Sequence, residues 1–97
     1  MSNKATIQRT TFIDHPSEEK SYGFRIYDDN GQSYCNTLKE NIFSMSPQEF
    51  LDHIQLEIDA DPVALSIFDF ALERGIYIDE YWYKFDLTND GPRLICT

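Results

Sequence analysis

The sequence predicts an α+β fold, in which an antiparallel sheet carries two helices packed on one of its faces. Two observations predict it. Segments with strand-like alternation lie toward both ends of the 97-residue chain, and two segments with helix-start signals lie in the middle. Strands grouped with strands and helices with helices give the order β-β-β-α-α-β-β along the chain. A chain of this length makes a single domain, residues 1–97.

The first predicted strand is Ala5–Ile13, where isoleucine and threonine alternate with polar residues in period two. Pro16 then ends the pairing, and the charged residues around it predict a solvated loop.

The clearest hairpin joins Ser21–Asp28 to Gln32–Leu38. Asn30-Gly31 lies between them and predicts a two-residue type I′ turn, because both central positions need a positive φ. This turn would place Tyr27 opposite Tyr34 and Ile26 opposite Cys35. One face of the hairpin, the predicted core face, would then carry Phe24, Ile26, Cys35 and Thr37, and the other would carry Arg25, Tyr27, Tyr34 and Asn36.

Two helices are predicted from their first residues. Ser46-Pro47-Gln48-Glu49 forms a capping box with proline at the first helical position, and this helix runs to about Ile58. Its apolar face carries Phe50, Leu51, Ile54 and Ile58.

Asp61-Pro62 repeats the start signal, and the second helix runs to Arg74 with Gly75 as its C′ residue. It is apolar over most of its circumference, which predicts a central helix packed on two sides; only Ser66, Asp69 and Glu73 form a polar stripe.

The C-terminal part returns to strand composition. Ile76–Thr88 alternates aromatic and polar residues, a turn is predicted at 89–92, and Arg93–Thr97 pairs back as a short strand.

Negative charge is concentrated in one segment. Residues 40–80 hold ten acidic residues and one basic residue, Arg74, which is the whole net charge of −9; the flanks hold seven acids and seven bases. Such a field argues against direct binding of nucleic acid or of anionic membranes, and favours a basic protein surface as partner. No apolar run is long enough for a membrane span and the start has no signal-peptide core, so we expect a soluble, cytoplasmic protein.

No catalytic or metal signature is present. The only histidines are His15, in a loop, and His53, on an acidic helix, and neither is paired with a nucleophile. No metal or phosphate-loop spacing occurs, and Asp28-Asp29-Asn30-Gly31 fails as a calcium loop because Ile26 stands where the first aspartate is needed. We therefore expect no enzyme activity, no cofactor and no metal, and we interpret Cys35 and Cys96 as small buried or half-buried residues.

The candidate partner-binding surface is the outer side of the first helix. There Glu49, Asp52, His53, Leu56, Glu57 and Asp59 place an acidic rim around an exposed leucine, which has the anatomy of a contact surface. The alternative is that Leu56 packs against a neighbouring loop and the acids form an ordinary hydrated helix face. A second candidate surface is the polar–aromatic hairpin face of Arg25, Tyr27, Tyr34 and Asn36.

These features predict a small, acidic, non-enzymatic protein that docks a basic protein surface and regulates it. Its sharpest form is an inhibitor of a nucleic-acid-binding protein, a DNA mimic of the antitoxin, immunity or anti-defence type, whose carboxylates stand where phosphates would lie. The alternative is an interaction module, or a homodimer, that uses the aromatic sheet face.

Overall fold

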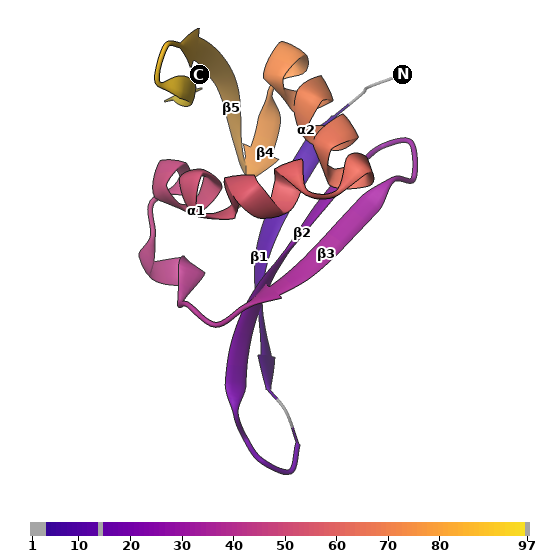
Figure 1. Cartoon of the computed structure of the whole chain (residues 1–97), viewed down its shortest axis with the longest axis vertical. Helices are drawn as coiled ribbons and strands as arrows, with labels where there is room; N and C mark the ends of the chain where they lie inside the picture. Colours follow the sequence, from indigo (N-terminus) through magenta and orange to yellow (C-terminus); the bar gives the residue numbers. More distant parts are fainter. Residues whose placement is uncertain (1–3, 14, 97) are drawn as a thin grey trace.

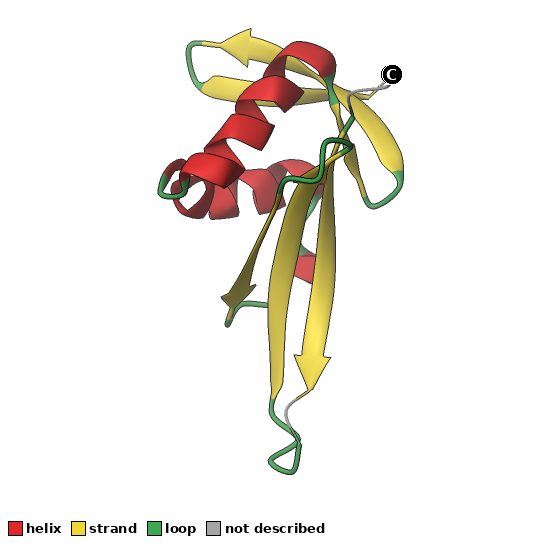
Figure 2. Ribbon diagram, turned by 90° about the vertical axis from the view of Figure 1, so that its right-hand side faces the viewer, coloured by secondary structure: helices red, strands yellow, loops and turns green. Residues whose placement is uncertain are grey.

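The computed structural model describes residues 4–13 and 15–96 and has an α+β fold, as predicted. A six-stranded sheet has the order β3-β2-β1-β4-β5-β6, and both α-helices lie on one of its faces (Figures 1 and 2). The elements are β1 (Ala5–Ile13), β2 (Lys20–Asp28), β3 (Ser33–Leu38), the 3₁₀ helix η1 (Ile42–Ser44), α1 (Pro47–Asp59), α2 (Pro62–Arg74), β4 (Ile76–Ile78), β5 (Tyr81–Thr88) and β6 (Gly91–Cys96).

The sheet is mixed, so the prediction of a purely antiparallel sheet is wrong. β4 pairs with β1 in parallel, with Ala5 opposite Ile76 and Ile7 opposite Ile78, whereas every other neighbouring pair is antiparallel. The physical reason is the long connection through both helices, which returns the chain to the free edge of β1 in the same direction as β1.

The predicted strand over residues 76–88 is divided by a tight turn. Ile78 pairs with Tyr81, so Asp79 and Glu80 form a two-residue hairpin loop, and both have positive φ, 52° and 73°. This is the backbone that a type I′ turn requires, but it is occupied by residues that carry no sequence signal for one.

Both helices begin as predicted. The Ser46 hydroxyl accepts from the Glu49 amide at 3.2 Å, and the Glu49 carboxylate accepts from the Ser46 amide at 3.1 Å. The Asp61 carboxylate accepts from the amides of Val63 and Ala64, and Gly75 follows α2 with φ 104°. The predicted apolar face of α1 is confirmed, because its four residues are all buried.

The register of the β2–β3 hairpin differs from the prediction by one residue. The Asp28 amide donates to the Gln32 carbonyl at 3.1 Å, so the loop has three residues, 29–31, with Gly31 at φ 89°. The Asp28 carboxylate stabilises this loop by accepting from the Asn30 and Gln32 amides at 2.9 and 3.0 Å.

This shift reverses the faces of β3. Tyr34 now lies opposite Ile26, and Asn36 lies opposite Phe24 on the helix-covered face. Cys35 and Thr37 turn to the helix-free face, so the predicted core face of Phe24, Ile26, Cys35 and Thr37 is wrong in its second half.

The core lies between the sheet and the two helices. β1, β2 and β4 contribute alternate residues, and α1 and α2 contribute their inner faces. The buried residues are Ala5, Ile7, Phe24, Ile26, Leu38, Ile42, Phe50, Leu51, Ile54, Ile58, Ala64, Ile67, Phe68, Ala71, Ile76 and Ile78.

Arg9 anchors three segments at the edge of this core. Its Nη1 donates to the carbonyls of Ile42 and Met45 at 2.9 and 2.8 Å, which fixes the 3₁₀ segment. Its Nε donates to Asp79 at 3.2 Å, and its Nη2 pairs with the same carboxylate. Burial lowers the pKa of Arg9, and the side chain is only 9% exposed.

The β1–β2 hairpin extends past the rest of the sheet (Figure 1). β3 pairs with β2 only as far as Tyr22, and β4 pairs with β1 only as far as Ile7, so the two long strands continue alone toward Ile13 and Lys20. Neither helix in the described part of the chain has the length and apolar character needed to cross a membrane.

Candidate functional site: the acidic face of helix α1

The net charge of the protein is concentrated in its helical layer. The segment 40–80, which contains η1, α1, α2 and β4, is net −9, whereas the acids and bases of the rest of the sequence cancel. α1 itself holds four acidic residues and no lysine or arginine, and Glu40 and Asp61 lie in the chain segments on either side of it. The strongest negative field therefore surrounds α1 rather than the sheet.

The centre of the outer side of α1 is an exposed leucine. The side chain of Leu56 is 80% exposed, more than any other large hydrophobic residue in the described part of the chain. Asp52 lies one turn before it and Asp59 one turn after it, and Glu49 lies two turns before it. We call Glu49, Asp52, Leu56 and Asp59 the α1 acidic face. The alternative that Leu56 packs against a loop is wrong.

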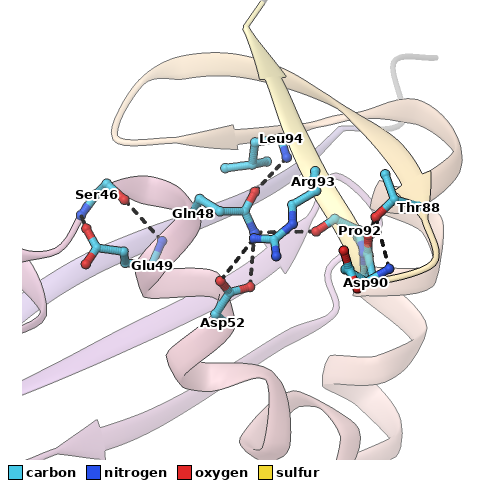
Figure 3. Close-up of polar contacts among 10 residues, drawn as sticks. Ser46, Gln48, Glu49, Asp52, Thr88, Asp90, Pro92, Arg93 and Leu94 are labelled. Atoms are coloured by element: carbon cyan, nitrogen blue, oxygen red, sulfur yellow. Dashed lines mark hydrogen bonds and ion pairs between the residues drawn. The ribbon is translucent and has the colours of Figure 1, made fainter.

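Two of these acids are held by contacts within the chain. The Glu49 carboxylate is part of the capping box, and hydrogen bonds from the Ser46 amide and hydroxyl lower its pKa. Asp52 accepts from Gln48 Nε2 at 3.0 Å and lies 3.4 Å from Arg93 Nη1, as Figure 3 shows. Arg93 therefore adds one cation beside the N-terminal half of this face.

The Asp59 carboxylate is not neutralised by a cation among the residues that the structure describes. It accepts from the neutral Gln55 side chain at 3.0 Å, and it makes no ion pair with any residue that the structure describes. The C-terminal half of the α1 acidic face, around Leu56 and Asp59, is consequently its least neutralised part.

His53 and Glu57 lie on one flank of α1 rather than at its centre. His53 Nε2 is 3.5 Å from Glu40 Oε2, and the pKa of Glu40 is lowered first by its own backbone amide and then by His53. Glu57 is half-buried, with one carboxylate oxygen buried and unbonded within the described residues. The pKa of Tyr34 in β3 is raised, chiefly by desolvation and then by Asp61 and Glu57, so both carboxylates lie within electrostatic range of Tyr34.

The second candidate surface is divided by the hairpin register. Arg25 and Tyr27 lie on the helix-free face of the sheet, where the Arg25 guanidinium stacks 4.5 Å from the Tyr27 ring centre. Tyr34 packs against Phe24 on the opposite, helix-covered face, and Asn36 lies on that face too. The four residues therefore do not form one surface.

The helix-free face of the sheet is hollowed. An open hollow of about 870 Å³ lies across β3, β2, β1 and β4, and both polar and aromatic residues line it. Phe12 and Tyr77, which the sequence did not single out, line it beside Arg25 and Tyr27. Arg9 and Phe24, which belong to the opposite face of the sheet, also border it. The full lining is Thr6, Gln8, Arg9, Thr10, Phe12, Phe24, Arg25, Tyr27, Cys35, Tyr77, Asp79 and Glu80.

Cys35 is exposed on this face, so its interpretation as a buried or half-buried residue is wrong; the register shift is the reason. The side chain of Cys96 lies outside the described residues. Within residues 4–13 and 15–96, no group of three or more histidine, cysteine, aspartate or glutamate side chains is placed to hold a metal ion.

Sequence reasoning missed the residues that reach α1 from distant elements. Arg93 comes from β6 and contacts Asp52, and Glu40 comes from the segment after β3 and contacts His53. Neither contact could be predicted from the spacing of these residues in the sequence. The Gln48–Asp52 and Gln55–Asp59 pairs, by contrast, have a local signal, the i, i+4 spacing on one helix.

No protein-family model, curated protein or solved structure matches the chain, so no function is carried over from a relative.

Proposed function

We propose that this protein is a small, acidic, non-enzymatic binding protein that docks a basic protein surface through the α1 acidic face. The observation that carries the proposal is Leu56, which is 80% exposed on the outer side of a helix with four acids and no lysine or arginine. In its finer form, the target is a nucleic-acid-binding protein that this protein inhibits by presenting carboxylates where phosphates would lie.

The charge supports the proposal because it would raise the rate of association with a basic partner more than the affinity of the complex. Clustered surface charges raise the association rate with an oppositely charged partner, and this effect falls as salt screens it. Because Asp59 is paired with no cation in the described chain, its charge is available to a partner without breaking an internal ion pair.

Leu56 supplies an apolar contact, which the surrounding charges do not. A single exposed leucine is ordinary on a protein surface, but a leucine with an acidic rim matches the apolar centre and polar rim of a contact surface. Removal of such a centre is expected to shorten the lifetime of a complex, whereas removal of a rim charge slows its formation.

The test is affinity capture from lysate of the native host, read by quantitative mass spectrometry. The capture is done at about 0.1 M salt, where the Debye length is about 10 Å, and at about 1 M, where it is about 3 Å. The proposal predicts a basic or nucleic-acid-handling protein that is retained at the lower salt concentration and released at the higher one.

The matched variants are Asp59→Lys and Glu19→Lys, which change net charge equally. Asp59 lies on the α1 acidic face at the last residue of the helix, where a lysine suits the helix dipole. Glu19 is exposed in the loop between β1 and β2, away from α1. We expect Asp59→Lys to lose the partner and Glu19→Lys to retain it. Equal retention by both variants would refute the proposal.

This pair is a cleaner test than reversal of Asp52 or Glu57, the substitutions that the sequence alone favours. Asp52→Lys would place a cation against Arg93, and Glu57→Lys would bury part of a charged side chain beside β3. Either variant could lose binding by unfolding rather than by losing its charge.

A further inference from the structure

The two edges of the sheet are protected very differently. At β6, Gln48 Oε1 accepts from the Leu94 amide at 2.7 Å and Gln48 Nε2 donates to the Pro92 carbonyl at 3.4 Å (Figure 3). These are bonds that a neighbouring strand would otherwise make, so a side chain of α1 closes this edge.

At the opposite edge, β3 leaves backbone groups facing outward. The hairpin closes with the Asp28–Gln32 bond, and hydrogen-bonded pairs alternate from there, so Ser33, Cys35 and Thr37 direct their N–H and C=O groups away from β2. The Thr37 amide donates to the Asn36 side chain at 2.9 Å. Within the residues that the structure describes, no hydrogen bond reaches the outward groups of Ser33 or Cys35.

The composition of β3 does not prevent pairing. Ser33–Leu38 contains no charged residue and no proline, the residues that commonly block an open edge. Residues 1–39, which include β1, β2 and β3, hold five acids (Asp14, Glu18, Glu19, Asp28, Asp29) and five bases (Lys4, Arg9, Lys20, Arg25, Lys39), so this part is neutral. This part of the chain therefore adds no net charge at the edge, and the acids within electrostatic range of β3, Asp61 and Glu57, belong to the helical layer.

We propose that two copies of this chain pair antiparallel through β3, with Cys35 of one copy opposite Cys35 of the other across a two-fold axis. In this register Ser33 faces Thr37 of the second copy, so all three outward-facing residues of each strand are used. The Thr37 amide exchanges the Asn36 side chain for a carbonyl of the second copy. The result is one continuous sheet through both chains.

The register has a chemical consequence. Residues in a hydrogen-bonded antiparallel pair have Cα atoms about 5.5 Å apart. This separation lies within the range of about 4.4–6.8 Å that a disulfide spans. Both Cys35 side chains would lie on the helix-free face, where Cys35 is exposed.

The first test is mild oxidation of a Cys96→Ser variant with diamide. Two Cys35 thiols would form the disulfide, and diamide takes up the two electrons and two protons. The control is Ser66→Cys in a Cys35→Ser/Cys96→Ser background, which places one exposed thiol on α2. We expect roughly tenfold more disulfide-linked dimer from Cys35 than from the control, because paired thiols react at a high effective concentration.

The register is tested with Ser33→Cys and Thr37→Cys, each in the background without native cysteines. A mixture of the two variants should form a mixed disulfide on oxidation, whereas each variant alone should not. Self-crosslinking of the separate variants at the level of the mixture would overturn the register.

The second test is molar mass by sedimentation equilibrium, from low micromolar to millimolar concentration. We expect the mass to rise with protein concentration from that of one chain to that of two. At a given protein concentration, the dimer fraction should increase with salt, because screening weakens repulsion between the acidic helical layers. Cys35→Pro removes only an outward N–H, a place where an edge strand tolerates proline, and should leave a folded monomer.

Two results would overturn the proposal: the mass of one chain throughout with no excess Cys35 disulfide, or a dimer that persists in a folded Cys35→Pro variant. The α1 acidic face is a different surface and its binding weakens with salt, so failure of the dimer would leave the proposed function standing.

Discussion

Replacement of Arg9 by methionine should destabilise the protein more than any single surface substitution. Methionine keeps the apolar stem against Phe43 and Phe50, over whose rings the guanidinium lies at 5.8 and 5.2 Å, but removes every donor. The carbonyls of Ile42 and Met45 lose the bonds that now hold η1 against β1.

The magnitude follows from those contacts. A hydrogen bond to a charged group is worth about 1.5–3 kcal/mol, and two carbonyls lose one each. The pair with Asp79 adds little, because that side chain is 33% exposed and solvent screens it. The avoided desolvation of the guanidinium offsets part of the loss, which leaves a net cost of about 3 kcal/mol. A domain of this kind has a total stability of about 5–15 kcal/mol.

Urea denaturation, followed by the fluorescence of Trp82, the single tryptophan, measures this cost. Asp79→Asn is the matched control, because asparagine tolerates the positive φ at this position and keeps one carbonyl acceptor. It should cost about 1 kcal/mol or less. A cost below about 1 kcal/mol for Arg9→Met, or equal costs for both variants, would refute the view that the two carbonyl bonds dominate.

Three other predictions concern the backbone and the helix cap. Glu80→Gly should stabilise the protein by about 0.5–1 kcal/mol, because glycine accepts the φ of 73° in the β4–β5 turn; no gain in urea midpoint would contradict this. Gly75→Ala should lower the free energy of unfolding by about 2–4 kcal/mol, since a Cβ there would overlap the Trp82 ring. Gly31→Ala, at a position with a similar φ but open space, should lower it by about 1 kcal/mol. Equal shifts in melting temperature for the two variants would contradict the packing argument. The pKa of Glu49 is lowered in the folded state, so its stabilisation should be complete above the unfolded pKa of about 4.3 and should be lost as pH falls through the folded value. The advantage of wild type over Glu49→Ala in urea should therefore shrink only under acid conditions, and an advantage that stays constant at low pH would disprove the role of the carboxylate.

Local signals in the sequence were sufficient to predict where the two α-helices begin and end. The capping box at Ser46, the Asp61-Pro62 start and Gly75 each act over a few residues, and the helical repeat identified the buried face of α1 without tertiary information. The exposure of Leu56 follows from the same repeat, because it lies opposite the buried face.

Features that depend on competition or on distant contacts were not predictable. Asn30-Gly31 favours a two-residue turn, but the Asp28 carboxylate holds a three-residue loop, and this one-residue shift exposed Cys35 and divided the second candidate surface. The Asp79–Glu80 turn contains no glycine or asparagine, and its anchor, Arg9, is 70 residues away in the sequence. The pairing of β4 with β1 likewise depends on contacts far apart in the chain.

The sequence predicted the central residues of the proposed site but not the contacts at its flanks. Periodicity placed Glu49, Asp52, Leu56 and Asp59 together, but it also placed Glu57 with them. Glu57 is instead half-buried on the flank of α1 with one carboxylate oxygen buried, and β6 brings Arg93 against Asp52. These effects arise from the tertiary arrangement, which spacing along one helix does not report.

The most direct test of the α1 acidic face compares Leu56→Ser with Ile13→Ser in the capture experiment at low salt. Both variants remove an exposed aliphatic side chain, 80% exposed on α1 and 57% exposed at the end of the β1–β2 hairpin. We predict that Leu56→Ser loses the captured partner while Ile13→Ser retains it at the wild-type level. Retention of the partner by Leu56→Ser, or equal loss by both variants, would contradict the proposal that α1 is the docking surface.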